Sequence, residues 1–410
     1  MQILIIHKGF PGQFKHLIPV LQERGNQIIS ITSTRQKPSI PNGVYNINYY
    51  INKPNGSDTF PLASEIETKI IRGDAVAKAA QSLKARGLQP DLIMGHPGWG
   101  EMLFLHDVWP QVPQLHYVEF FHGVPGTDND IKDIHSSTIS LSSKTRATVK
   151  NTNLLTNLNQ MKTGITPTVF QHSLLPEWAQ LKTKIIHDGI DTKWLKPNNS
   201  AQLTIPNGLV FKYGDPVITF INRTYEPYRG VHIFLDALAK LQKKNPSVHA
   251  VMVGKDTPRV SYGAHRRDGK GWLTALKEQY GNHLDWSRIH PIGTVKHSTL
   301  KLVYQISAAH IYLSYPFVLS WSLLEAMSCG GLVIGSNTKP VKELITNNQT
   351  GLLVPFEDSS LLSTVISEVL EKPNSFNKLR SQARELIAKN YHIEDCLYEQ
   401  VDLLNSVANQ

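Results

Sequence analysis

Cysteine is scarce in this chain, and long apolar runs are missing. The 410 residues include two cysteines, Cys329 and Cys396, which are too few for a disulfide framework or a cysteine-based zinc site. We read both as structural thiols. No apolar stretch reaches the roughly 18 residues that cross a bilayer, and the apolar opening at residues 2–6 is shorter than the core of a secretory signal. The sequence therefore predicts a cytoplasmic protein.

Two common nucleotide-binding signatures are also absent. No Gly-x-Gly-x-x-Gly follows the first apolar segment, which argues against a dinucleotide oxidoreductase. Residues 263–271 read Gly-Ala-His-Arg-Arg-Asp-Gly-Lys-Gly. Five residues separate the first glycine from Gly-Lys, and neither Ser nor Thr follows the lysine. This spacing does not fit a P-loop.

The charge that is present is basic and dispersed. The formal net charge is +9, and Lys and Arg are spread along both halves instead of forming a tail. An anionic partner is compatible with this balance, whether nucleic acid, a membrane face or a phosphorylated small molecule, and so is simple solubility.

Apolar segments alternate with helical patterns along the whole chain. Short runs that are apolar at every position, such as residues 2–6 and 217–221, are typical of strands buried on both faces of a parallel sheet. Helical spacing follows at residues 13–24 and again at 231–243. The alternation predicts an α/β protein with two doubly wound domains, residues 1–183 and 184–390, and a final helical segment, 391–410.

Several motifs of the second half resemble one enzyme family. They are Ile-His-Asp-Gly-Ile-Asp at 186–191, Asn-Arg-Thr-Tyr-Glu-Pro-Tyr-Arg-Gly at 222–230, Leu-Leu-Glu-Ala-Met-Ser-Cys-Gly at 323–330 and Asn-Asn-Gln-Thr-Gly at 347–351. Together they resemble the retaining glycosyltransferases of family 4, also called glycosyl transferases group 1. The resemblance implies the GT-B fold, in which two Rossmann-like domains face a cleft and the last helix crosses back to the first domain.

Arg223 and Arg229 are the predicted catalytic and donor-binding cations. They follow a buried strand and precede a helix, where backbone N–H groups add to an anion site. Transfer of a sugar from a diphosphate carrier leaves negative charge on the departing phosphate, and fixed cations stabilise that charge. Two solvated surface arginines are the alternative interpretation.

The same resemblance assigns the rest of the donor site. Glu325, expected at a helix start, would accept hydrogen bonds from the ribose hydroxyls. Backbone N–H groups around Leu319, Ser320 and Trp321 would hold the phosphate and sugar. The family usually carries a second Glu eight residues before Glu325, and this sequence has Phe317 there, as in a subgroup of the family. Phe317 is therefore a candidate wall of the cleft.

The first half offers candidates at the ends of predicted strands. Gly12 would let the backbone approach the donor. His96, Glu101 and Glu119 are candidates for the acceptor side. His122 is the predicted catalytic histidine, because it corresponds best to the one with which family members contact the donor sugar. For any one histidine, packing or surface exposure is the alternative.

The predicted activity is transfer of a sugar, as by a hexosyltransferase of class EC 2.4, from a nucleoside diphosphate sugar to a hydroxyl acceptor. We expect retention, no cofactor and no metal, although Asp128 and Asp130 imitate a metal motif of another glycosyltransferase fold. The acceptor would be a glycan, a lipid-linked molecule or a small molecule of glycan or glycoconjugate biosynthesis. We expect no nucleic acid partner, but include peripheral contact with an anionic inner membrane face. A nucleotide-sugar epimerase and a non-catalytic binding protein are the alternatives.

Overall fold

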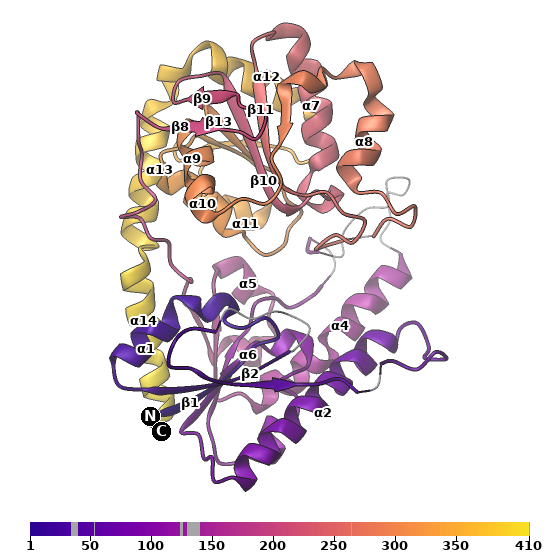
Figure 1. Cartoon of the computed structure of the whole chain (residues 1–410), viewed down its shortest axis with the longest axis vertical. Helices are drawn as coiled ribbons and strands as arrows, with labels where there is room; N and C mark the ends of the chain where they lie inside the picture. The colour runs from indigo at the N-terminus through magenta and orange to yellow at the C-terminus, as the bar shows by residue number, and fades with distance from the viewer. Residues whose placement is uncertain (34–39, 53, 124–125, 129–139, 264, 410) are drawn as a thin grey trace. The chain divides into compact units, whose positions relative to one another are not determined.

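Two compact units make up the chain in this computed structural model. The structure describes residues 1–33, 40–52, 54–123, 126–128, 140–263 and 265–409. One unit contains Met1–Gly189 and Glu394–Gln410, and the other contains Ile190–Ile393. Each consists of a parallel sheet with helices around it (Figure 1).

The first unit has a parallel seven-stranded sheet in the order β3-β2-β1-β4-β5-β6-β7. Ile3 to Ile6 of the central strand are fully buried, as its continuous apolar sequence predicts. The strands are β1 (Gln2–Ile6), β2 (Gln27–Ser33), β3 (Tyr45–Tyr49), β4 (Leu92–Gly95), β5 (Gln114–Tyr117), β6 (Thr163–Thr166) and β7 (Thr183–Ile185).

The helices of the first unit include the last helix of the chain, which confirms the expected return to the first domain. One face of α14 is buried, and Gln400 Nε2 on it donates to the carbonyl of His187 at 3.1 Å. The helices are η1 (Gly12–Lys15), α1 (Leu17–Glu23), α2 (Ser64–Ala85), η2 (Pro97–Trp99), α3 (Leu105–Val108), α4 (Leu141–Gln160), α5 (Val169–Ser173), α6 (Glu177–Gln180) and α14 (Ile393–Ala408).

The second unit has a parallel six-stranded sheet in the order β12-β11-β10-β13-β14-β15 and a separate antiparallel hairpin. The sheet strands are β10 (Val217–Thr224), β11 (His249–Lys255), β12 (Ile289–Pro291), β13 (Ala309–Tyr312), β14 (Val333–Ser336) and β15 (Leu352–Val354). The hairpin strands are β8 (Gln202–Thr204) and β9 (Val210–Lys212).

Alternate side chains of β10 enter two different cores. Val217 and Ile221 pack into the core that includes α9, α10 and α13. Ile218 and Phe220 pack into the core on the opposite face, with α7, α8 and α12. Because successive strand residues point to opposite faces, an apolar run without alternation requires helices on both. Figure 1 shows α7 and α8 on one side of β10 and α9, α10 and α13 on the other.

The helices of the second unit include those that contribute to the two cores just described. They are η3 (Pro227–Arg229), α7 (Val231–Lys244), α8 (Trp272–Tyr280), η4 (Gly281–His283), η5 (Trp286–Arg288), α9 (His297–Ile306), α10 (Trp321–Ser328), α11 (Lys339–Lys342), α12 (Ser359–Glu371), η6 (Pro373–Phe376) and α13 (Asn377–Asn390).

The boundary between the two units lies later in the chain than residue 183, the position predicted from the sequence. β7 pairs in parallel with β6 and so completes the first sheet, and the change falls between Gly189 and Ile190. The predicted helix 13–24 is also divided, into the 3-10 turn η1 and the shorter α1.

Both cysteines are buried free thiols, and burial raises the pKa of each to about 12. This supports their structural role. In the part of the chain that the structure describes, no helix is both long and apolar enough to cross a membrane.

In each sheet there is a point at which successive strands of the chain change from being added on one side to being added on the other. It lies between β1 and β4 in the first sheet and between β10 and β13 in the second. Ligands of doubly wound folds bind outside the carboxyl ends of the strands at such points. The predicted site residues should therefore lie at the carboxyl edges of the two sheets, at these points.

Candidate functional site

The turn after β10 is pressed onto the neighbouring strand end. Gly230 has a φ of +71°, and a Cβ there would lie 2.6 Å from Cβ of Leu313, the residue after β13. Only glycine fits this combination of conformation and close approach. Gly230 therefore lets η3 and the start of α7 lie against the switch point of the second sheet.

Arg229, the last residue of η3, places a buried cation at this point. Its side chain is 7% exposed. Nη1 donates to the hydroxyls of Tyr312 and Ser314 at 3.2 and 2.8 Å, and Nη2 donates to the carbonyl of Val318 at 3.1 Å. All three partners are neutral, and no described carboxylate forms an ion pair with Arg229. The buried Glu226 acts on this charge only from beyond ion-pair distance, so the guanidinium can still contact an anionic ligand.

Arg223 belongs to β10 itself, near the carboxyl end of that strand, and not to the loop after it. The side chain is exposed and has neither an ion pair nor a hydrogen bond with any residue that the structure describes. The two predicted cations therefore lie at the same sheet edge, one buried and fixed, the other exposed and free to move.

The start of α10 lies at the same edge, with part of its hydrogen-bonding capacity in use. Ser320 caps the helix by accepting from the backbone N–H of Ser322. The Ser320 backbone N–H donates to the Tyr312 hydroxyl at 2.8 Å, so it is not free for a phosphate. Leu319 is buried and Trp321 is partly buried. Of the three predicted backbone donors, that of Ser320 is already occupied.

Glu325 lies inside α10 and not at its start, because the helix begins at Trp321. Its carboxylate accepts from His297 Nε2 and from the Tyr304 hydroxyl, both at 2.8 Å. Tyr304 is buried, whereas the His297 side chain is 46% exposed. These two side chains, and not the helix dipole, hold the carboxylate, and the ribose contact stays a prediction.

Phe317 is 6% exposed and belongs to a group of rings around Arg229. Its ring centroid lies 4.6 Å from that of Tyr262 and 5.6 Å from that of Tyr228. The Arg229 Cζ lies 5.9 Å from the Phe317 ring. We call the following residues the aromatic cluster: Tyr228, Tyr262, Tyr315, Phe317 and Phe356.

In the first unit, four side chains form a hydrogen-bonded row at the switch point. His7 Nε2 is 2.7 Å from Gln13 Oε1, and Gln13 Nε2 donates to Glu119 Oε1 at 3.1 Å. His96 Nε2 is 3.2 Å from Glu119 Oε2. His7, His96 and Glu119 follow β1, β4 and β5, which are neighbours in the sheet.

Backbone donors determine the direction of these hydrogen bonds. The Nδ1 atoms of His7 and His96 each accept a backbone N–H, from Gly9 and Gly98 respectively, at 3.1 Å. A neutral imidazole that accepts at Nδ1 carries its proton on Nε2. Both histidines therefore donate through Nε2, His7 to Gln13 and His96 to Glu119. Because Gln13 also donates to Glu119, the row ends at that carboxylate.

The ionisation of the row follows from burial and from these bonds. Burial lowers the pKa of His7 to about 4, so this histidine is neutral at neutral pH. Burial alone would raise the pKa of Glu119, but hydrogen bonds from His96 and Gln13 outweigh it and lower that pKa. Glu119, 25% exposed, is thus a fixed carboxylate that a hydroxyl can approach.

Gly12 is required by the packing of His7, and its predicted approach to the donor stays a prediction. Its φ is +53°, and a Cβ at this position would collide with the His7 imidazole. The missing side chain makes room for His7. Glu101 does not join the row either, since it is 1% exposed and accepts from the buried Tyr49 hydroxyl at 2.7 Å. It lies in the interior and not on a wall that a ligand could reach.

His122 forms a separate pair with Asp128. Its Nδ1 lies 2.7 Å from Asp128 Oδ2, and the His122 side chain is 22% exposed. Asp128 is buried and also lies 3.6 Å from Lys150 Nζ. In a neutral imidazole, a buried carboxylate beside Nδ1 favours the proton on that atom and leaves Nε2 as an acceptor.

The metal motif considered in the sequence is only partly described. Asp130 lies outside the described residues, and the carboxylate of Asp128 is engaged by His122 and Lys150. Among the residues that the structure describes, no group of three or more His, Cys, Asp or Glu side chains has the arrangement of a metal site.

Sequence reasoning missed several residues that complete these sites. His7 and Gln13 complete the row on Glu119, and the Trp99 ring stacks on His96 at 3.8 Å with an interplanar angle of 7°. Glu226 holds the loop that carries Tyr262. The position of His7 at the end of the first strand was the one signal that sequence offered.

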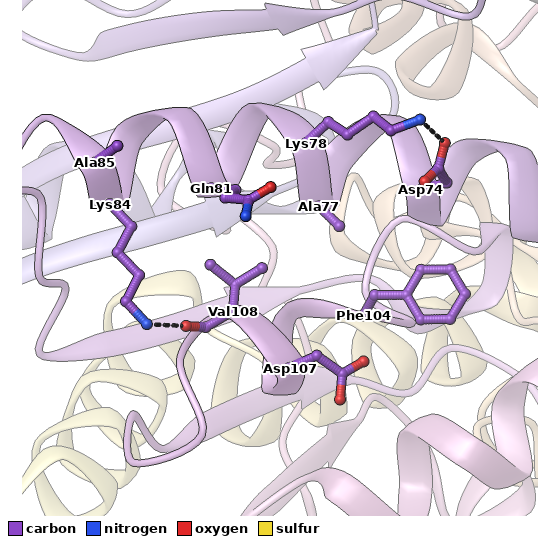
Figure 2. A pocket seen from close by; sticks show the side chains of 9 residues that line it. All are labelled: Asp74, Ala77, Lys78, Gln81, Lys84, Ala85, Phe104, Asp107 and Val108. Carbon is purple, nitrogen blue, oxygen red and sulfur yellow. Dashed lines mark hydrogen bonds and ion pairs between the residues drawn. The ribbon is translucent and has the colours of Figure 1, made fainter.

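A surface hollow between α2 and α3 lies away from these sites (Figure 2). It is lined by the second half of α2, whose last residue precedes the start of β4, so it lies toward the amino ends of the strands. Lys78 pairs with Asp74 at 2.7 Å, and Lys84 donates to the carbonyl of Val108. Both lysines that line the hollow are thus already bonded to other residues of the protein.

Two family patterns match the chain. That of the glycosyl transferase family 4 group matches residues 24–195, and that of the glycosyl transferases group 1 matches residues 202–386. A trehalose synthase of Pyrococcus horikoshii is 25% identical over 47% of this chain and 44% of its own length. A phosphatidyl-myo-inositol mannosyltransferase of Mycolicibacterium smegmatis is 25% identical over 51% of this chain and 53% of its own. The matches thus span about half of these relatives.

Solved structures are similar over nearly the whole chain. The sucrose-phosphate synthase of Thermosynechococcus elongatus has a TM-score of 0.72 at 19% identity, with 99% of each chain covered. HepE of Anabaena, solved in complex with UDP-glucose, has a TM-score of 0.66 at 17% identity, with 99% of this chain and 100% of that chain covered. Fold and family patterns agree, and the chain belongs to the group 1 glycosyltransferases of family 4, which have the GT-B fold.

Proposed function

We propose that this protein transfers a hexosyl group from a nucleoside diphosphate sugar to a hydroxyl acceptor, with retention of configuration and without a metal ion. The observation that carries the proposal is Arg229, a cation 7% exposed at the switch point of the second sheet. Its described partners are neutral oxygens. A buried charge with no ion-pair partner in contact among the described residues is costly, and a bound diphosphate would supply an anion in contact with it.

The proposed reaction moves negative charge toward the two arginines. The bond between the anomeric carbon and the phosphate oxygen breaks, and the acceptor oxygen bonds to the same carbon on the same face. The hydroxyl proton passes to the departing phosphate. Arg229, held rigidly, and Arg223, exposed at the same edge, stabilise the charge that develops there.

We assign the acceptor to the first unit. Glu119 is a partly exposed carboxylate fixed by two donors, and it can accept a hydrogen bond from the acceptor hydroxyl. His122, oriented by Asp128, presents Nε2 to accept a hydrogen bond from a hydroxyl of the donor sugar. This division would leave the diphosphate to the second unit.

The substrates proposed are those of glycan or glycoconjugate biosynthesis. UDP-glucose is bound by the similar HepE, and a mannosyltransferase is among the relatives, so a hexose on a nucleoside diphosphate is the proposed donor class. The acceptor class is a glycan, a lipid-linked molecule or a small molecule. Peripheral contact with an anionic membrane is part of the proposal, supported by the exposed Trp178 and Leu181 beside Lys182.

A ligand screen followed by product analysis tests the function. A nucleoside diphosphate at 100 times its dissociation constant adds about 2.7 kcal/mol to the stability of the protein and raises its melting temperature. The donor that binds is then incubated with a panel of hydroxyl acceptors. Free nucleoside diphosphate together with a new glycoside supports the proposal. Interconversion of the donor without acceptor indicates an epimerase, and binding without turnover indicates a non-catalytic protein.

A further inference from the structure

One carboxylate of the second unit anchors the loop between β11 and α8. Glu226 follows β10 and is 1% exposed. Its Oε2 accepts from the backbone N–H groups of Ser261 and Tyr262 at 3.0 and 3.1 Å, and from the Thr224 hydroxyl at 2.6 Å. A single buried oxygen thus holds the strand end and the middle of loop 256–271 together.

One further hydrogen bond and one close approach lie in the same part of the loop. The Ser261 backbone N–H also reaches Thr224 Oγ1 at 2.9 Å. Gly263 has a φ of +82°, and a Cβ there would lie 3.4 Å from the Tyr228 ring. The backbone of Ser261 and Tyr262 is therefore held by Thr224 and Glu226, and Gly263 lies beside the Tyr228 ring of the turn that carries Arg229.

This anchoring determines where the Tyr262 ring lies. The Arg229 Cζ is 5.6 Å from the Tyr262 ring and 5.9 Å from the Phe317 ring. The two rings are 4.6 Å apart at 63°. Tyr262 is partly exposed and Phe317 is buried beneath the same cation. The surface next to the proposed diphosphate site is thus aromatic where a carboxylate was expected.

We propose that Glu226 is a positioning residue that holds Tyr262 beside Arg229, and that the Tyr262 ring, supported by Phe317, is the surface against which the donor sugar packs. The proposal rests on the function proposed above and names how its donor is recognised. Aromatic rings pack against the C–H groups of a pyranose, whereas a carboxylate binds its hydroxyls. Recognition at this position then depends on the apolar face of the sugar.

Hydrogen exchange tests the anchoring without any ligand. In Glu226→Ala, the amides of Ser261 and Tyr262 lose their acceptor, and we expect them to exchange at least about tenfold faster. Glu226→Gln keeps an oxygen at the same place and should retain most of the protection, which a purely electrostatic role would not predict. Glu385→Ala, at an exposed glutamate of α13, is the control. Unchanged exchange in Glu226→Ala would overturn the anchoring.

Ligand affinity tests the sugar contact. The probes are UDP, GDP and ADP, each alone and as its glucose ester, measured by calorimetry. For the pair that binds most tightly, Glu226→Ala and Tyr262→Ala should weaken the glucose ester about tenfold and change the free diphosphate less than twofold. Tyr262→Phe keeps the ring and should bind both as the wild type does.

The outcomes separate this inference from the proposed function. An equal loss of affinity for the diphosphate and for its ester, or no loss for either, would overturn the role of Tyr262. If the wild-type protein binds none of the six probes, the proposed function and the sugar contact both fail. The exchange experiment then still decides whether Glu226 anchors the loop. Tyr262→Ala changes a partly exposed side chain, so it remains informative if Glu226→Ala does not fold.

Discussion

The Tyr312 hydroxyl joins Arg229 to the start of α10. It accepts from Arg229 Nη1 at 3.2 Å and from the Ser320 backbone N–H at 2.8 Å. The two donors come from segments on either side of the switch point, the turn after β10 and the loop after β13. Arg229 is therefore held in position before any ligand binds, which lowers the reorganisation that charge stabilisation would otherwise require.

The first prediction concerns the acceptor side. Glu119→Gln places an amide N–H₂ opposite one of two donors, His96 or Gln13, and disrupts that hydrogen bond. We expect kcat/KM for the acceptor to fall by roughly tenfold or more, with the affinity for the nucleoside diphosphate unchanged. Steady-state kinetics with varied acceptor measure this. Glu177→Gln, at an exposed glutamate of α6, is the control, and equal kinetics in both variants would remove Glu119 from the site.

Activity is predicted to survive removal of divalent metal. Arg229 and Arg223 would supply the positive charge that Mg²⁺ or Mn²⁺ provides in metal-dependent transferases. The measurement is turnover after dialysis against EDTA, compared with the same sample after addition of Mn²⁺. Loss of activity that Mn²⁺ restores would contradict the metal-free proposal and return attention to Asp128 and Asp130.

Phe317→Glu is predicted to impair the enzyme and not to improve it. A carboxylate at this buried position would lie among Tyr228 and Tyr262 and next to Arg229. It would either be desolvated without a partner or neutralise the cation that the diphosphate needs. We expect kcat/KM to fall about tenfold or more, while Phe317→Leu, which stays apolar, loses less. Higher turnover in Phe317→Glu would favour the non-catalytic interpretation of the natural sequence.

Stability is predicted to fall as the pH drops from about 6.5 toward 4. Burial lowers the pKa of His7 and His187 to about 4 and that of His116 and His310 to about 3. In this window the unfolded chain binds protons that the folded chain does not. Each of these histidines therefore lowers the free energy of unfolding by roughly 1.4 kcal/mol per pH unit.

Denaturant midpoints measured across that window test the pH prediction. Replacing a buried histidine, as in His310→Gln, should make the pH dependence shallower. The control, His283→Gln at an exposed position, should leave the pH dependence of the midpoint unchanged. Because the chain has two units, the unfolding of each is followed separately. A constant midpoint between pH 6.5 and 4.5 would contradict the prediction.

Strands with continuous apolar sequence could be predicted, whereas elements with polar interiors could not. β1 and β10 are buried on both faces and are recognisable from sequence alone. α4 was not predicted, because its buried face mixes three asparagines with three apolar residues; they are Asn151, Asn153 and Asn157, and Ala147, Leu154 and Leu158. Asn153 donates to the carbonyl of Pro97 at 2.7 Å, a long-range bond that satisfies a polar group inside the unit and that the sequence pattern does not reveal.

The candidate site divides in the same way. Arg229 could be predicted because its position after a buried strand and before a helix is local in sequence. The convergence of His7 and His96 on Glu119 depends on the order of three strands, which one sequence does not specify. Glu325 was recognised, but its partners His297 and Tyr304 lie on another helix, and its place within α10 differs from the helix start that the sequence suggested.

Turnover of Arg229→Ala tests the central claim most directly, namely that this residue stabilises the charge on the departing diphosphate. The account predicts that kcat falls by roughly 100-fold or more, the scale for loss of one preorganised charge-stabilising group. Arg223 is exposed and does not contribute to the core, and kcat of Arg223→Ala should fall as well. The control, Arg146→Ala at an exposed position of α4, should retain full activity. Melting temperatures without ligand confirm that each variant is folded. Near-normal turnover by folded Arg229→Ala with its natural donor would contradict the account.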